Sequence, residues 1–189
     1  MNKTLLSAAM IAGFGVVAFA PVTARASDGT ITINGQITTA TCTIQVNGGT
    51  ASPTITLPTV QSSQFTASGT ASGFTAVTIA LSGCAAGSGT PAVTTVSPYF
   101  EQGPNTDLTS GYLKNATGTA TNVEVMLSTT NATTGKVNLA AGSGTQYTGT
   151  APTLASNPSF TYYAAYVSTA AAVTAGTVAT SVQYDLNYH

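Results

Sequence analysis

Side chains that could do covalent or acid–base chemistry are few in this chain. It has two cysteines, Cys42 and Cys84, and one histidine, His189, which is the last residue. Acid–base and nucleophilic catalysis need a base held near a nucleophile or a substrate proton, and the acidic residues here are scattered. Two cysteines without a nearby histidine do not make a metal site. We expect no enzyme, no catalytic residue, no metal and no cofactor; a carboxylate pair brought together by folding is the one catalytic arrangement left open.

Residues 1–26 have the pattern of a secretory signal peptide. Lys3 precedes an apolar run over residues 5–20, and Ala24-Arg25-Ala26 matches a small-x-small cleavage site. A membrane anchor is the alternative, because the run approaches the length of a short spanning helix. The glycines within the run and the A-x-A ending favour cleavage, which would make Ser27 the mature N-terminus.

Export makes the two cysteines a predicted disulfide. In an oxidising compartment an even pair of cysteines most simply forms a cross-link. Cys42 and Cys84 are 42 residues apart. Closing a loop of that length stabilises a fold by roughly 3–5 kcal/mol in the chain-entropy model.

Composition points to one all-β, exported domain. The chain has 189 residues, of which 43% are hydrophobic and 5% charged, against roughly 25% charged in an average soluble protein. Threonine and serine are abundant, and they suit strands that face water without charge. Without Lys3 and Arg25, two lysines remain against five acids, a net charge of 2 − 5 = −3. Two lysines cannot form a basic patch, so we expect no nucleic-acid partner.

Alternation of apolar and polar residues dominates the chain after residue 26. Helical periodicity is weak, and Gly, Pro and Asn turns separate the alternating stretches. Nine short alternating stretches at this spacing, one of them only three residues long, predict a β-sandwich of about eight strands. The expected strands are an N-terminal stretch at 27–37 and then residues 41–46, 54–57, 74–81, 93–100, 122–129, 137–139, 160–168 and 177–188.

The final stretch, residues 177–188, is unusually long and apolar for a strand that ends a domain. Its even-numbered residues form one face: Val178, Thr180, Val182, Tyr184, Leu186 and Tyr188. No strand follows it, so the chain itself supplies a neighbour on one side at most. Residues 27–37 alternate in the same way, with Gly29, Ile31, Ile33 and Gly35 on one face.

Two motifs have alternative interpretations. Asn115-Ala116-Thr117 and Asn131-Ala132-Thr133 match the glycosylation sequon, but chance matches are expected in a chain this rich in Asn and Thr. Three tyrosines at 162, 163 and 166 could form a sugar-binding platform; core packing within a strand is the favoured interpretation.

Four features together resemble the type 1 fimbrial subunit family, the structural pilins of the bacterial chaperone–usher pathway. DGTITINGQITTATC is a glycine-framed strand that leads into Cys42, and Cys84 follows the strand FTAVTIAL. The C-terminal block FTYYAAYVSTAAAVTAGTVATSVQYDLNYH contains an aromatic strand and a final alternating strand. Gly176 and the penultimate Tyr188 match the C-terminal motif of that family. The resemblance covers nearly the whole mature chain and is nearest to major subunits.

The resemblance implies an incomplete immunoglobulin-like β-sandwich that lacks its final strand and is completed by a donor strand from another subunit. By position, residues 27–37 would be the donor, with Gly29, Ile31, Ile33 and Gly35 as the inserted residues, and residues 38–189 would be the pilin domain. The acceptor groove and chaperone-binding strand would include Gly176, Val178, Val182, Tyr184, Leu186 and Tyr188.

Partners follow from the same resemblance: other copies of the chain, a periplasmic pilus chaperone, an outer-membrane usher and a tip adhesin. The expected product is a cell-surface fimbria, reached through the periplasm, that supports cell adhesion and biofilm formation. The alternative is a minor or tip pilin with a glycan-binding adhesin role. Adhesins with two domains carry a lectin domain before the pilin domain, and the 163 residues after Ala26 leave no room for one.

Overall fold

A computed structural model describes residues 31–87 and 92–189. The chain divides into two units, one ending at Gln36 and one spanning Ile37–His189. The predicted signal peptide and Gly29 lie outside the described residues. Ile31–Gln36 form no helix or strand, so the fold is that of the second unit.

The second unit is built from antiparallel strands joined by long loops and three short 3-10 turns. Among the described residues, no helix has the length and hydropathy needed to span a membrane. The strands are β1 (Thr41–Val46), β2 (Ala71–Ala85), β3 (Val96–Phe100), β4 (Leu113–Lys114), β5 (Val123–Ser128), β6 (Ser159–Ser168) and β7 (Tyr184–Tyr188); the turns are η1 (Ser62–Gln64), η2 (Thr133–Gly135) and η3 (Leu154–Ser156).

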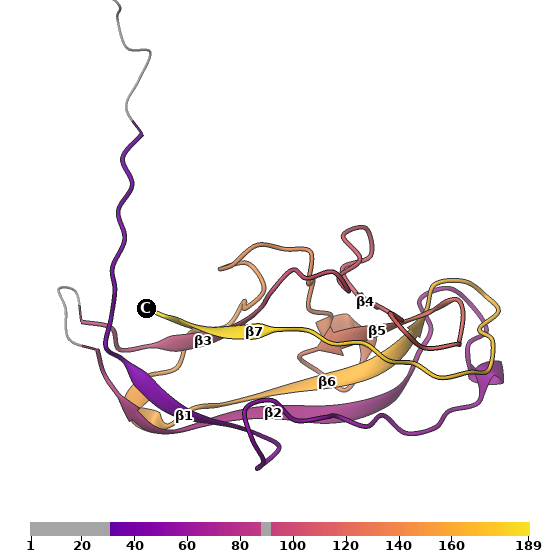
Figure 1. The fold of residues 1–189 in the computed structure, drawn as a ribbon, viewed down its shortest axis with the longest axis horizontal. Helices are drawn as coiled ribbons and strands as arrows, with labels where there is room; N and C mark the ends of the chain where they lie inside the picture. The colour runs from indigo at the N-terminus through magenta and orange to yellow at the C-terminus, as the bar shows by residue number, and fades with distance from the viewer. Residues whose placement is uncertain (1–30, 88–91) are drawn as a thin grey trace, which may run out of the picture. The chain divides into compact units, whose positions relative to one another are not determined.

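The strands form two sheets, seen one above the other in Figure 1. The larger sheet has the order β1-β2-β6-β5-β4, and the smaller one pairs β3 with β7. The long central strands β2 and β6 set the register of the larger sheet, with Val77 opposite Tyr162 and Ile79 opposite Phe160. Such β-branched and aromatic cross-strand pairs stabilise antiparallel sheets.

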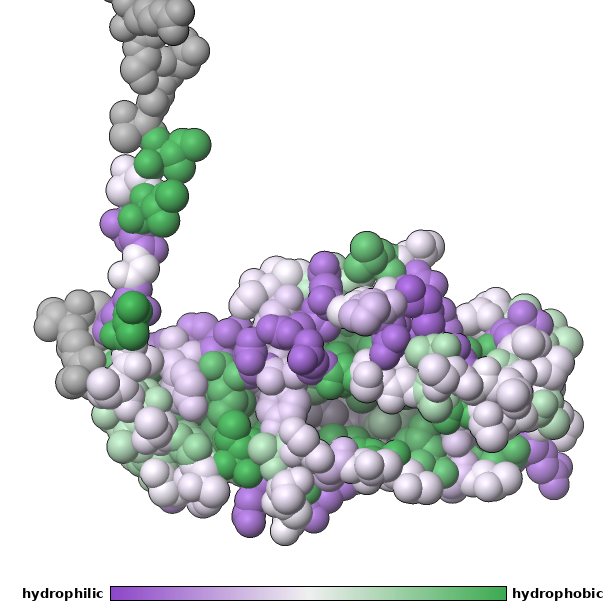
Figure 2. All heavy atoms as spheres, viewed as in Figure 1, coloured by the Kyte–Doolittle hydropathy of each residue, from purple (hydrophilic) through white to green (hydrophobic). Residues whose placement is uncertain are grey.

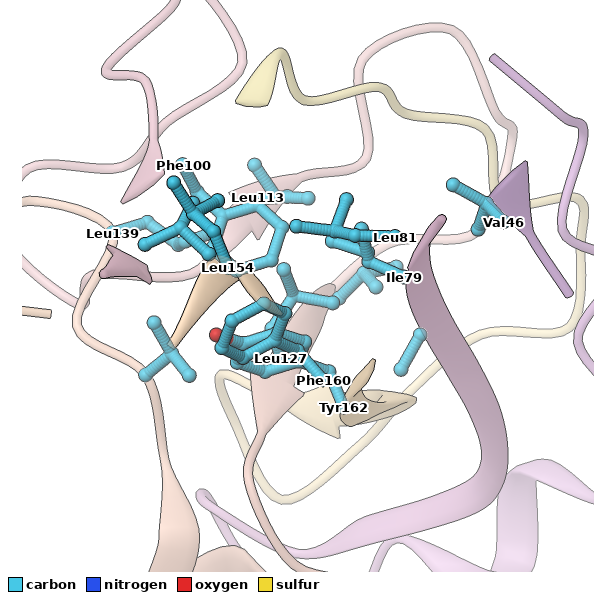
Figure 3. Close-up of a cluster of buried hydrophobic side chains, with 14 of the residues drawn as sticks. Val46, Ile79, Leu81, Phe100, Leu113, Leu127, Leu139, Leu154, Phe160 and Tyr162 are labelled. Atoms are coloured by element: carbon cyan, nitrogen blue, oxygen red, sulfur yellow. The ribbon is translucent and has the colours of Figure 1, made fainter. Parts of the chain in front are cut away.

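Side chains from both sheets meet in one core. Figure 3 shows Ile79 and Leu81 of β2 and Phe160 and Tyr162 of β6 in the same cluster as Phe100 of β3. The Phe100 and Tyr162 rings pack edge to face with centroids 4.9 Å apart. Tyr162 is buried, as the core interpretation of the tyrosine cluster predicted, while Tyr163 and Tyr166 are half-buried. The predicted all-β, two-sheet sandwich is confirmed.

The predicted disulfide is also present. Cys42 and Cys84 are bonded. The bond joins the start of β1 to the end of β2, next to the paired residues Thr41 and Ala85. It therefore pins the edge strand β1 to the centre of the larger sheet.

Some strand boundaries differ from the prediction. Residues 54–57 and 137–139 form no strand, and Leu139 lies in a turn. β4 was not predicted because two residues are too few to show alternation. The predicted last strand, residues 177–188, is a regular strand over Tyr184–Tyr188 alone. The preceding residues are extended too, but their partner is a loop, so no regular ladder forms.

Candidate functional site

The C-terminal segment, residues 177–189, is held along one edge. Its second half bonds to β3: the Glu101 amide donates to the Gln183 carbonyl at 2.9 Å, and Thr95 and His189 exchange backbone hydrogen bonds of 3.0 and 2.9 Å. Antiparallel pairing alternates, so odd-numbered residues of the segment face β3 and even-numbered ones turn their backbone groups away. The end of the chain is therefore anchored in the smaller sheet.

The first half of the segment is held by the 115–120 loop. The amides of Ala116 and Ala120 donate to the carbonyls of Ala179 and Thr177 at 2.9 and 3.0 Å, and these backbone bonds are reinforced by the side chain of Asn115. Its amide nitrogen donates to the carbonyls of Ala120 (2.8 Å) and Thr177 (3.1 Å). Its amide oxygen accepts from the backbone of Gly118 (3.1 Å) and Ala179 (2.9 Å). The residue that matched a glycosylation sequon is thus a structural clamp, which sequence reasoning missed.

Gly176 lies where this clamp begins. A Cβ added to it would collide with the backbone of Ala120 and the hydroxyl of Thr119. Glycine here allows the chain to approach the 115–120 loop closely, a common reason for glycine in an extended segment. Gly176, predicted from the family resemblance, therefore has a packing role at the start of the C-terminal segment.

The other edge of the C-terminal segment is open. The backbone groups of Val178, Thr180 and Val182 have no hydrogen-bond partner within the described part of the chain. Their side chains are half-buried, while those of Ala179, Ser181 and Gln183 are exposed. The apolar face predicted from the sequence thus points inward, beside an unpaired edge.

A second unpaired segment faces it. Residues 52–60 are extended, and their backbone makes no hydrogen bond to any described residue. Burial alternates along this segment, with every second side chain half-buried, beginning at Ala51 and continuing through Pro53, Ile55 and Leu57. Proline is tolerated here because an unpaired edge needs no amide donor. Sequence reasoning predicted a strand at 54–57 but gave it no part in the site.

Between the two segments lies a groove with an apolar lining. Half-buried side chains of both walls pack against the core: Ile55, Leu57, Val178, Val182, Tyr184, Leu186 and Tyr188. Cys42 and Ile44 of β1 pack against the same core. Figure 2 shows hydrophobic side chains exposed along a hollow in the middle of this face. The hydroxyl of Thr180 is buried in this lining without a hydrogen-bond partner among the described residues. An open edge above an apolar floor is a surface that another strand can complete.

Tyr184 bridges the two walls of the groove. Its hydroxyl donates to the carbonyl of Ala51 at 2.7 Å. Burial raises the pKa of Tyr184 and also that of Tyr188. The Tyr184 phenol therefore stays protonated at neutral pH and remains a donor.

The described part of the predicted donor, residues 31–37, exposes its apolar side chains, whereas the groove half-buries its own. Ile31 and Ile33 are 90% and 89% exposed. Ile37 shares their alternation and is 98% exposed, although the predicted set of inserted residues omitted it. Three exposed isoleucines on one side of an extended stretch are far more than a surface needs.

The carboxylate pair left open by the sequence does form. Glu101 and Asp185 come together at the β3–β7 pair, where a hydrogen bond and repulsion from Asp185 raise the pKa of Glu101. Asp185 is exposed and Glu101 is half-exposed. No group of three or more metal-ligating side chains occurs within residues 31–87 and 92–189.

Comparison with known proteins gives a consistent answer. The family model described as "Fimbrial protein" matches residues 31–189. The major fimbrial subunit SMF-1 of Stenotrophomonas maltophilia is 38% identical over 92% of this chain and 100% of its own length. The F17 fimbrial protein of Escherichia coli is 36% identical over 92% of this chain and 95% of its own.

Among solved structures, the P pilus rod subunit PapA aligns with 85% of this chain and 100% of its own, at 19% identity and a TM-score of 0.47. The family match spans every described residue. The chain therefore belongs to the fimbrial protein family and is a structural subunit of a surface fimbria, a polymer of such subunits, rather than an enzyme.

Proposed function

We propose that subunits join by strand addition: residues 27–37 of one copy enter the groove of another copy. The observation that carries this proposal is the unpaired edge of residues 178–182 above an apolar floor. A strand laid there would pair its backbone with the open edge and bury alternate side chains. This is the general mode of β-augmentation, of which chaperone–pilin complexes are a well-known example.

The energetics favour the isoleucines as anchors. Burying one isoleucine side chain contributes ~1.5–3 kcal/mol. Ile31 and Ile33 are almost fully exposed, so both gain this burial on insertion. Gly29 and Gly35, as predicted donor residues, fit where the groove is shallow. The contact is head-to-tail and does not close on itself, so it generates a filament.

A free subunit with this groove needs protection before assembly. Exposed strand edges and apolar patches drive aggregation. We propose that a periplasmic pilus chaperone covers the groove first, with the strand formed by Val178, Val182, Tyr184, Leu186 and Tyr188 as its binding site. An outer-membrane usher then exchanges the chaperone for the next subunit, and a tip adhesin ends the filament.

Residues 1–26 direct the chain to the periplasm in this proposal, and the assembled fimbria supports adhesion and biofilm formation. Two relatives that match this chain over nearly their whole length are a major fimbrial subunit and a fimbrial protein. Their similarity supports a place along the shaft. Antibody labelling along the filament is the expected result in electron microscopy; labelling confined to tips would contradict it.

Charge on the donor face tests the assembly mode. Ile31→Asp and Ile33→Asp place a carboxylate in the apolar groove, so we expect no fibres but a folded, disulfide-bonded subunit. Thr32→Asp adds the same charge to the opposite face of the strand and is the matched control; it should polymerise. Fibre yield is measured by electron microscopy and by shearing from cells. Normal fibres from the two isoleucine variants would refute strand addition.

A further inference from the structure

The hydrogen bond from Tyr184 to Ala51 places an aromatic ring across the groove. Tyr184 lies on β7 and Ala51 on the opposite wall, 2.7 Å from hydroxyl to carbonyl. The ring also lies near Phe100 of the core, with centroids 6.5 Å apart. An inserted strand must therefore cross over this ring.

We propose that Tyr184 sets the register of the inserted strand by requiring Gly29 of the donor copy opposite it. This inference rests on the proposed strand addition. Directly opposed residues of neighbouring strands place their Cβ atoms roughly 4.5–5.5 Å apart on the same face. The Tyr184 ring fills the space into which the opposing side chain would point. Glycine is the one residue with no side chain to place there.

The direction of the inserted strand follows from where it leaves its own subunit. Thr38 and Ala40 lie against Gly87, because a Cβ at Gly87 would collide with them. Gly87 pairs with Val93, and the neighbouring Thr94 donates to the carbonyl of His189 at 2.8 Å. The donor stretch therefore starts at the end of the domain where the C-terminus lies.

In a head-to-tail filament, that end abuts the opposite end of the preceding copy, where residues 176 and 177 lie. The donor enters there and runs toward residue 188, antiparallel to the C-terminal segment. Counting in opposite directions from a Gly29–Tyr184 pair gives the register. Ile31 faces Val182, Ile33 faces Thr180, Gly35 faces Val178, and Ile37 lies beside Gly176.

A second register would place Gly35 over Tyr184. The attachment of Thr38 and Ala40 to Gly87 of the donor's own domain excludes that register. In that register residues 39–43 of the donor copy would have to lie opposite residues 176–180. Ala40 is packed on Gly87 of its own copy, and Thr41 already begins β1. The Gly29 register ends at Ile37, which is 98% exposed and free to enter the groove.

This register also gives Ile37 a function. It is the last residue before the packed Thr38, and it covers the entrance of the groove next to the Asn115 clamp. The end of the groove near Leu186 is covered less well. If cleavage follows Ala26, Ser27 is the one inward-facing residue beyond Gly29 that can reach it.

A peptide-exchange experiment tests the register. The acceptor is the full mature chain carrying Ile31→Asp and Ile33→Asp, which cannot donate its own strand. The ligand is a synthetic peptide of residues 27–37, in its natural sequence, with Gly29→Val or with Gly35→Val. Each peptide is titrated against acceptors with Tyr184, Tyr184→Phe and Tyr184→Val, and binding is read by fluorescence anisotropy. Circular dichroism and an intact Cys42–Cys84 bond show that each acceptor is folded.

With Tyr184, we expect the Gly29→Val peptide to bind roughly ten- to a hundredfold more weakly than the natural peptide, the usual range for overpacking. Tyr184→Phe keeps the ring and should still reject it, whereas Tyr184→Val should restore binding. The Gly35→Val peptide should not be rescued by Tyr184→Val. Rescue of Gly35→Val instead, or no rescue of Gly29→Val, would overturn the register. Failure of the natural peptide to bind any acceptor would overturn strand addition itself.

Discussion

One asparagine side chain, Asn115, reinforces the backbone hydrogen bonds between the 115–120 loop and residues 177 and 179. Its two amide atoms bond to four backbone groups, two of which belong to residues 177 and 179. It holds the first half of the C-terminal segment extended, which keeps the opposite edge straight and open. A residue that looks like a modification site thus supports one wall of the groove.

Asn115→Ala should lower the free energy of unfolding by about 1–3 kcal/mol, because four hydrogen bonds to partly buried and exposed backbone groups are lost. The measurement is urea unfolding of the purified chain. Asn131→Ala is the matched control: Asn131 belongs to the second sequon, is exposed and makes no hydrogen bond with a described residue. Equal stability of the two variants would show that the 177–179 segment does not depend on this clamp.

At the scale of elements, the β3–β7 pair has an apolar inner face and two carboxylates close together on its outer face. Its inner face contributes Val96 and Phe100 to the core, with Tyr184 and Leu186 packed against them. Asp185 of its outer face faces Glu101, whose pKa is raised by the hydrogen bond and the repulsion between the two carboxylates. The small sheet is therefore held by apolar packing and weakened by this repulsion at neutral pH.

The sign of the pH dependence follows from the raised pKa of Glu101. The folded chain binds a proton there more tightly than the unfolded chain, so the contribution of this group to stability falls as pH rises from its ordinary pKa through the raised one. Glu101→Gln should make the chain more stable than the natural sequence at about pH 7. The difference should shrink at about pH 4, where the raised pKa of Glu101 leaves its carboxyl mostly protonated.

Thermal unfolding of both chains at the two pH values is the measurement. Asp107→Asn is the control of opposite sign, since hydrogen bonds from the Thr109 and Ser110 backbones lower the pKa of Asp107. A Glu101→Gln chain that is equally or less stable at neutral pH would contradict the repulsion.

At the scale of the whole molecule, the domain has a complete core but an incomplete edge. Val96, Met126 and Leu139 are fully buried without help from another chain. The Cys42–Cys84 bond secures the larger sheet independently of assembly. What remains open is the strip between residues 52–60 and the C-terminal segment, and its length suits one added strand.

Purified filaments should therefore be more resistant than free subunits. In the proposed assembly each junction buries several apolar side chains and pairs a backbone edge, and bound partners stabilise the folded state by mass action. We expect a high-mass ladder in denaturing gels without heating, which collapses to monomer on boiling. Ile33→Asp subunits should run as monomer under both conditions, and Thr32→Asp should keep the ladder. A ladder that vanishes without heating would place the main contacts elsewhere.

Much of the fold was predictable from local pattern. Alternation located β1, β2, β3, β5 and β6, because a half-buried strand must alternate wherever it lies. The presence of two cysteines in a chain with an export signal predicted the disulfide. Val178 and Val182 were placed on an apolar face because of the same alternation, and both pack against the core. The inserted face with Ile31 stays a prediction.

The rest depended on long-range contacts that no local pattern contains. Residues 54–57 alternate like a strand, yet their neighbour is missing, so they remain extended and unpaired. Residues 177–181 alternate as well, but a loop and the Asn115 amide hold them instead of a strand. Alternation predicts which face of a segment is buried, but it does not predict which segment lies beside it.

By itself, the sequence determined the alternating faces, the disulfide and the family, because these depend on residue type and spacing. The tertiary structure decided that the walls of the groove are residues 52–60 and 178–188, that Asn115 supports one wall, and that Tyr184 crosses between them. Those facts depend on residues 62 to 133 positions apart in the sequence coming into contact, and these contacts are set by the packing of the whole sandwich.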